Sequence, residues 1–255
     1  MAPTGPASGA RHLSSLAHMT LNRPITEVLA DVAAAQRRLE AVVRLMHDAE
    51  VGEPSSLPGW TRGHVLTHLA RNADSQTAML LGAQRDEIVD QYPGGDAQRS
   101  GDIDAGAGRP LAEISADVAG GHERFLAAAE TMCDEAWLRL TRPRAGERPA
   151  WATVWARWRE VEVHLSDLGL GPESLASHVS AAFVESFLSG ETDQLPRRLP
   201  PERSSGTLDL DGAPTDRLLW LMGRPAGPVR LTVDGAEVRY DELVPWASAM
   251  WSPGA

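Results

Sequence analysis

Four long segments of this chain carry apolar residues at steps of three and four, the spacing of one face of an α-helix. They cover about 26–46, about 61–81, a stretch that begins at Pro110, and about 151–168. Thr26 and Thr61 are placed to cap the first two helices, and Pro110 suits a first helical turn, where its missing N–H costs nothing. Because amphipathic helices must bury their apolar faces against one another, the sequence predicts a four-helix bundle.

The last third of the chain changes character. Short helices are expected over 177–188 and 216–222, and short alternating runs that predict β-strands follow at 206–211, 229–233 and 236–240. Asp234-Gly235, between the last two runs, is a strong signal for a two-residue hairpin. This mixture predicts a small α+β unit after the bundle.

The predicted organisation therefore has three regions. We expect a disordered lead-in over 1–24, the bundle over 25–172 and the small C-terminal α+β domain over 173–255. The stretch 91–109 is polar and rich in glycine, and we interpret it as a loop long enough to cover a functional site. The fold class expected is α+β, mainly α.

Composition narrows the possible partners. A formal net charge of −11 argues against nucleic acid, because no basic surplus exists to displace counterions from phosphates. No apolar run approaches the ~20 residues that cross a bilayer, and the first residues lack a signal-peptide pattern, so no membrane partner is expected. Cys133 is the only cysteine, which excludes an intramolecular disulfide and suits a reducing cytoplasm. We expect Cys133 to be a small buried side chain and not a nucleophile.

Two of the predicted helices each carry a pair of side chains of the types that commonly bind metals. His64 and His68 lie four residues apart on the second helix, as do Glu160 and His164 on the fourth, so each pair shares a face. A catalytic zinc takes three protein ligands and keeps a fourth position open, and one histidine plus the Glu/His pair supplies that number. The same spacings occur in surface residues and ordinary ion pairs, so spacing alone leaves both interpretations open.

Two long motifs resemble those of a known family. Residues 56–72 (SLPGWTRGHVLTHLARN) resemble the start of the second helix of mycothiol-dependent maleylpyruvate isomerases, and residues 154–169 (VWARWREVEVHLSDLG) resemble their fourth-helix motif. The shorter segment 221–227 (LMGRPAG) is similar to the place where those enzymes carry an active-site arginine. The resemblance implies a DinB-like four-helix bundle with a small C-terminal α/β domain, in agreement with the organisation above.

Residue by residue, the resemblance implies zinc ligands at His68, Glu160 and His164 and a catalytic arginine at Arg224. It places His64 near the site but outside the ligand set, and it matches nothing in the segment 91–109.

Other residues near these motifs have two interpretations each. Asp167 either orients an imidazole N–H or caps the following turn. Trp60 most simply packs its loop onto the bundle, and a contact with the substrate is the less favoured interpretation. Arg157 and Arg159 are expected to form surface or interdomain ion pairs that contribute little individually.

The function implied is that of a zinc-dependent isomerase in an actinobacterial cytoplasm, which uses mycothiol to convert maleylpyruvate to fumarylpyruvate in the gentisate pathway. Its partners would be mycothiol and a small electrophilic substrate. Two alternatives stay open. A mycothiol S-transferase or thiol-exchange enzyme, in detoxification or natural-product biosynthesis, would need the same thiolate. A non-catalytic metal-binding regulatory module would show no thiol-dependent turnover.

Overall fold

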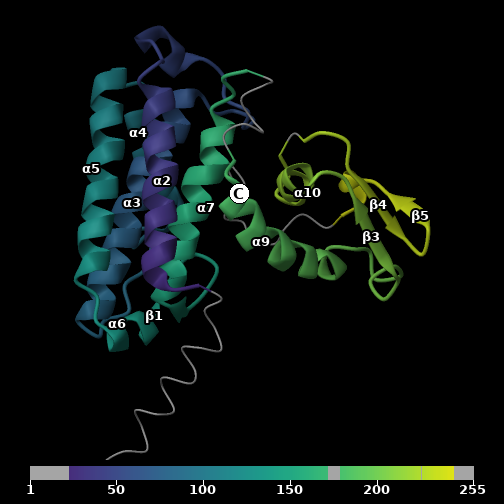
Figure 1. Ribbon diagram of the computed structural model, residues 1–255. Coiled ribbons are helices and arrows are strands. Elements are labelled where there is room, and N and C mark those ends of the chain that lie inside the picture. The colour runs from purple at the N-terminus through teal and green to yellow at the C-terminus, as the bar shows by residue number, and fades with distance from the viewer. Residues whose placement is uncertain (1–22, 172–178, 225, 244–255) are drawn as a thin grey trace, which may run out of the picture.

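Four long helices pack side by side along one half of the molecule, as the periodicity predicts (Figure 1). They are α2 (Ile25–Val43), α3 (Arg62–Gln84), α5 (Leu111–Glu130) and α7 (Trp151–Asp167). The computed structural model describes residues 23–171, 179–224 and 226–243. The apolar faces of the four helices form one core, in which Leu39, Leu66, Phe125 and Trp158 are fully buried. None of the helices in these ranges is long and apolar enough to cross a membrane.

Of the two predicted threonine caps, one is found in the structure and the other is not. Thr61 is the N-cap of α3, and its hydroxyl accepts the backbone N–H of His64 at 3.4 Å. α2, in contrast, begins directly after Pro24, whose carbonyl accepts the N–H of Glu27 at 3.0 Å. Thr26 therefore lies inside the first turn, and the prediction that it caps α2 is wrong, because the helix already begins at Ile25 and Pro24 occupies the N-cap position.

The segment 91–109 is not a long loop, because it contains the helix α4 (Gly95–Ala107). The buried residues of α4 include only one large apolar side chain, Ile103, so its periodicity is weak in the sequence. Small residues let α4 lie directly on α3. A Cβ added to Gly106 would lie 2.4 Å from Thr67 Cγ2, and one added to Gly63 would lie 2.0 Å from the carbonyl oxygen of Ala107.

Short elements close the ends of the bundle. The turn η1 (Asp48–Gly52) precedes α3, and α6 (Asp134–Leu138) leads into a small antiparallel pair, β1 (Leu140–Thr141) and β2 (Arg148–Pro149). Cys133 is the N-cap of α6 and is exposed, so the prediction of a buried thiol is wrong. Cys133 lies at a helix start on the surface and not in the core.

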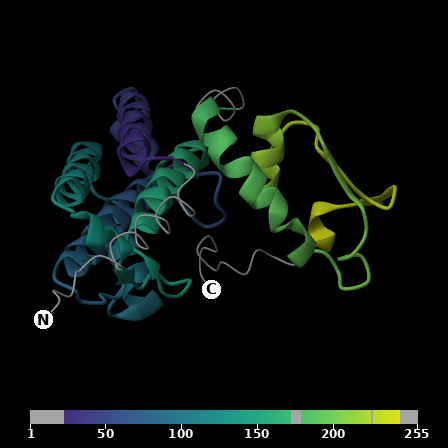
Figure 2. The same cartoon turned by 60° about the horizontal axis from the view of Figure 1, so that its bottom comes forward.

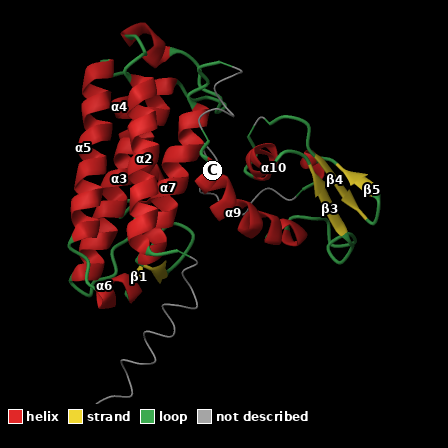
Figure 3. Ribbon diagram, in the orientation of Figure 1, coloured by secondary structure: helices red, strands yellow, loops and turns green. Residues whose placement is uncertain are grey.

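The C-terminal unit carries the three longer strands (Figure 3). Its elements are α9 (Ala181–Asp193), η2 (Leu195–Arg197), β3 (Leu208–Asp211), α10 (Pro214–Leu221), β4 (Arg230–Val233), β5 (Ala236–Val238) and η3 (Tyr240–Glu242). The strands form an antiparallel sheet in the order β3-β4-β5. Asp234 and Gly235 have φ of 50° and 79°, which confirms the predicted two-residue hairpin between β4 and β5.

The C-terminal unit has a small core of its own, which includes Leu195, Leu221 and Leu231. The predicted lead-in over 1–24 falls almost wholly on residues 1–22, and the predicted boundary at 172–173 on residues 172–178; both lie outside the described ranges.

Helix α9 lies between the bundle and α10 in both views of the ribbon (Figures 1 and 2). The rings of Phe183 and Phe187 on α9 each lie 5.6 Å from the Trp158 ring on α7. Arg159 on α7 forms a buried ion pair with Glu191 on α9, in agreement with the expected interdomain contact. Aromatic packing and a buried ion pair together fix the C-terminal unit against α7.

Candidate metal centre

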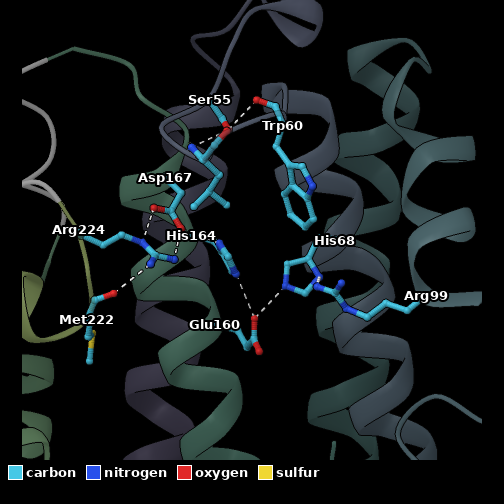
Figure 4. A network of polar contacts seen from close by, with 10 residues as sticks. Ser55, Trp60, His68, Arg99, Glu160, His164, Asp167, Met222 and Arg224 are labelled. Atoms are coloured by element: carbon cyan, nitrogen blue, oxygen red, sulfur yellow. Dashed lines mark hydrogen bonds and ion pairs between the residues drawn. The ribbon is translucent and has the colours of Figure 1, made fainter. Parts of the chain in front are cut away.

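The three predicted ligands meet between α3 and α7. His68 comes from α3 and Glu160 and His164 come from successive turns of α7; all three are buried, and their candidate ligand atoms lie within 4.8 Å of one another. His68 Nε2 lies 3.0 Å from Glu160 Oε2, and His164 Nε2 lies 3.4 Å from the same oxygen. Figure 4 shows the three side chains pointing toward one another. The structure thus brings together the residues that the sequence singled out, and their binding of a metal stays a prediction.

The protonation of the cluster follows from burial and mutual contact. Burial lowers the pKa of His68 to about 4, against the opposing effect of Glu160. Burial also acts to lower the pKa of His164, but its hydrogen bonds with Asp167 and Glu160 raise it above the ordinary value. Burial acts to raise the pKa of Glu160, yet the two histidines hold it well below its usual range. Without a metal, these contacts therefore favour an ionised Glu160 and a neutral His68, and they favour the protonated form of His164 up to a higher pH than in an exposed imidazole.

These residues fit a divalent cation. Two imidazoles and one carboxylate form a donor set found in catalytic zinc sites, and three protein ligands leave a coordination position open. The lowered pKa of Glu160 keeps its carboxylate ionised, and the carboxylate is buried. Solvent therefore screens its attraction to a cation only weakly. Because the pKa of His164 is raised, a cation competes with a proton for this imidazole.

His64 lies beside the cluster without joining it. Its Nδ1 lies 3.2 Å from the backbone nitrogen of Thr61 and accepts that N–H, while its Nε2 lies 3.6 Å from Asp104 Oδ1. The ring of Trp60 covers both histidines of α3, with centroids 6.2 Å from His64 and 5.6 Å from His68. Trp60 therefore lines the candidate centre in addition to packing its own loop.

Asp167 takes the first of its two predicted roles. Its Oδ2 lies 2.8 Å from His164 Nδ1, so the carboxylate accepts that N–H and turns Nε2 toward Glu160. Burial acts to raise the pKa of Asp167, but His164 and the charge of Arg224 lower it, which keeps the carboxylate ionised. A carboxylate behind a histidine in this way is the usual support of a metal ligand.

Arg224 reaches this network from the C-terminal unit. It follows Gly223, whose φ of 72° turns the chain after α10, and its side chain points toward the bundle (Figure 4). Nε and Nη2 of Arg224 donate to the two oxygens of Asp167 at 2.7 and 2.9 Å, and Nη1 donates to the carbonyl of Met222 at 3.0 Å. Arg224 is therefore connected to the ligand set through Asp167 and His164.

Sequence reasoning missed a second arginine at the centre. Arg99, on α4, is only 8% exposed, and its Nη2 lies 3.4 Å from His68 Nδ1. Its guanidinium carbon lies 5.9 Å from the centre of the Trp60 ring and 5.8 Å from that of Tyr92. Nothing in the sequence marked Arg99, because the helix that carries it was itself interpreted as a loop.

A third arginine contradicts the expectation of a surface ion pair. Arg157 on α7 is fully buried, and its Nη1 donates to the carbonyl of Leu69 and to Asn72 Oδ1 at 3.0 and 3.1 Å. Desolvation lowers its pKa to about 10. The expectation was wrong because α7 is enclosed by α2, α3 and α9, so its charged positions do not face solvent.

Comparison with known proteins agrees with this architecture. Residues 32–169, more than half of the chain, match the family described as the mycothiol maleylpyruvate isomerase N-terminal domain. No curated protein matches. Crystal structures of the mycothiol-dependent maleylpyruvate isomerase and of a histidine-to-alanine mutant of it superpose with a TM-score of 0.72.

Sequence identity to these two structures is 23% and 22%, and each comparison covers 83% of this chain and 94% of the other. At this identity the likeness shows the fold, and it confirms the expected class: mainly α, a DinB-like four-helix bundle with a small C-terminal α/β domain. The match over 32–169 shows more than the fold, and the chain belongs to the mycothiol maleylpyruvate isomerase N-terminal domain family.

Proposed function

We propose that this protein is a metal-dependent enzyme that uses mycothiol to convert maleylpyruvate to fumarylpyruvate. The observation that carries the proposal is the buried cluster of His68, Glu160 and His164 in a chain of this family. Zinc is the cation that we propose, because two imidazoles and a carboxylate suit it and leave room for one more ligand. Dependence on mycothiol would place the protein in the reducing cytoplasm of an actinobacterium.

The reaction needs a thiolate and a carbon–carbon double bond conjugated to a carbonyl group. A divalent cation at the cluster would supply an open coordination position at which a thiol loses its proton. The thiolate sulfur adds to one alkene carbon, and the displaced electron pair moves to the carbonyl oxygen, which leaves a single bond that can rotate. Return of that pair expels the thiolate and forms the trans double bond, so the thiol is recovered unchanged.

The protein's own residues prepare the site for this chemistry. Asp167 holds the N–H of His164 Nδ1 and so keeps Nε2 directed at the cluster. Arg224 holds Asp167 through two hydrogen bonds and joins the C-terminal unit to the centre. A direct contact between Arg224 and the substrate stays a prediction. Burial of the cluster strengthens every electrostatic interaction within it.

The proposal is tested with purified full-length protein, zinc, mycothiol and maleylpyruvate, with the products separated by chromatography. We expect fumarylpyruvate only when both metal and mycothiol are present. Glu160→Gln should lose bound zinc and turnover together. His64→Gln is the matched control, because it removes an imidazole beside the cluster but outside the ligand set, and it should retain zinc.

Two other results of the same assay would contradict the proposal and favour a different function. A stable conjugate between mycothiol and the substrate would indicate a mycothiol S-transferase. Zinc binding with no thiol-dependent turnover of any electrophile tested would indicate a regulatory module that binds metal without catalysis.

A further inference from the structure

Arg99 is a buried cation beside the candidate metal centre without a carboxylate partner. Among residues 23–171, 179–224 and 226–243, no carboxylate oxygen lies within ion-pair distance of its guanidinium. On the other side of the centre, Arg224 has Asp167 at 2.7 Å (Figure 4). The polar contacts of Arg99 are with His68 Nδ1 and the Tyr92 side chain, and neither carries a negative charge when it accepts as a neutral group. Arginine keeps its charge in proteins, and a buried charge without an opposite charge is costly, so the position of Arg99 indicates a ligand of negative charge.

The two histidines of the cluster point to the same conclusion. Nδ1 of His164 faces the carboxylate of Asp167 at 2.8 Å, whereas Nδ1 of His68 faces Arg99, which can only donate. When Nε2 of a histidine binds a metal, its Nδ1 carries the proton and donates to an acceptor, usually an oxygen. At His68 this would leave two donors, Nδ1–H and the Arg99 N–H, facing each other. One carboxylate oxygen near both would accept from both.

We propose that Arg99, together with Nδ1 of His68, forms a subsite that binds a carboxylate group of the substrate. The inference rests on the proposed function for its substrate class, an unsaturated acid that reacts with a thiol. The rings of Trp60 and Tyr92 contact the guanidinium and limit its orientation, so that its planar pair of N–H groups is held ready for a carboxylate.

Three other arginines near the centre already have hydrogen-bond or ion-pair partners within the protein. Arg224 pairs with Asp167, Arg109 pairs with Asp117 at 2.8 Å, and Arg157 donates to Leu69 and Asn72. Arg99 is therefore the guanidinium best placed to bind a ligand carboxylate. Because α4 carries Arg99, the position of α4 on α3 determines where that carboxylate lies relative to the cluster.

The subsite is tested by calorimetric titration of the zinc-loaded full chain with maleate, which has a cis double bond and cannot react without thiol. Arg99→Gln should weaken maleate binding about 10- to 100-fold, the usual effect of losing hydrogen bonds to a charged group. Arg109→Gln is the matched control, because it removes the same charge just after α4, and it should bind maleate within about twofold of wild type. Zinc content measured on each variant shows that the cluster is intact.

A second measurement needs no variant at Arg99. Zinc-loaded wild type should bind maleate at least tenfold more tightly than the uncharged diamide of maleic acid, because the amide cannot replace the ion pair. The inference is overturned if wild type does not bind maleate, if the diamide binds as tightly, or if a folded Arg99→Gln protein binds maleate within threefold of wild type.

Turnover separates the two proposals. If maleate binding depends on Arg99 but maleylpyruvate is not isomerised, the subsite stands and the proposed reaction is wrong. If isomerisation occurs and Arg99→Gln has wild-type maleate affinity and wild-type KM for maleylpyruvate, the reaction stands and the subsite is wrong. When both are right, Arg99→Gln raises the KM for maleylpyruvate and leaves that for mycothiol nearly unchanged.

Discussion

Replacement of Asp167 by asparagine should weaken both the metal centre and the attachment of the C-terminal unit. The Asp167 side chain is 1% exposed, and its carboxylate accepts hydrogen bonds from His164 and from two nitrogens of Arg224. Asparagine keeps the shape but removes the charge, and it replaces one acceptor oxygen by an N–H donor that faces other donors. Each contact therefore loses strength for a separate reason.

The magnitudes follow from burial. The side chains of Asp167 and Arg224 are only 1% and 8% exposed, so solvent does little to screen the attraction between them. Removal of one partner of such a pair costs about 3–5 kcal/mol of unfolding free energy, or about 6–20 °C in Tm. Loss of the acceptor behind His164 should lower zinc affinity about 10- to 100-fold.

Urea unfolding of the metal-free proteins and zinc competition against a coloured chelator measure the two effects separately. The double variant Asp167→Asn/Arg224→Leu should recover most of the lost stability, because no unpaired cation is left buried. It should not recover zinc affinity, because His164 still lacks its acceptor.

The lowered pKa of Asp167 adds a pH dependence to the stability difference. The contribution of the wild-type carboxylate is present above its unfolded pKa and is lost as pH falls through its lower folded pKa, so the two proteins should converge in acid. The reasoning is refuted if Asp167→Asn costs less than about 1 kcal/mol, or if the double variant is no more stable than the single one.

Three further predictions follow from the structure. Because the pKa of His164 is raised, zinc affinity should fall as pH drops through that pKa, and calorimetry in buffers of different ionisation enthalpy should show a release of protons on binding that increases as the pH is lowered toward that pKa. Cys133→Ser should turn over at nearly the wild-type rate with mycothiol, because Cys133 is exposed at the start of α6, whereas thiol-free wild type should be inactive; the reverse result would make Cys133 the nucleophile. Gly106→Val should destabilise the protein by about 1–3 kcal/mol in urea unfolding, because even a Cβ there would lie 2.4 Å from Thr67 Cγ2; wild-type stability would show that α4 does not pack tightly on α3.

The parts of the fold that could be predicted are those whose signal is local. α2, α3, α5 and α7 bury broad apolar faces, and the Asp234-Gly235 hairpin needs only its own two residues. α4 could not be predicted in the same way, because glycine contacts with α3 hold it in place and its buried face has one large apolar residue. A method that sees only hydrophobic periodicity reads such a helix as a loop.

In the candidate site, too, the residues with a local sequence signal could be predicted and those that depend on distant contacts could not. The spacing within α3 and α7 pointed to His68, Glu160 and His164, but it could not choose between His64 and His68. The choice depends on where α3 begins, since His64, three residues after the N-cap Thr61, accepts the backbone N–H of that cap. The roles of Arg99 and Arg224 depend on contacts with residues 31 and 57 positions away, which no local pattern encodes.

Arg157 gives the interior of the bundle a fixed positive charge about one turn before Glu160, and its hydrogen-bond partners within the described part of the chain include no carboxylate. A cation that binds at the cluster adds to this charge, and an anion that binds beside it offsets both. Each ligand should therefore raise the affinity for the other, and thermodynamic linkage requires the two factors to be equal. The bundle interior would then favour uptake of a cation and an anion as a pair over either alone, so the zinc affinity of the protein should depend on which acids are present in solution.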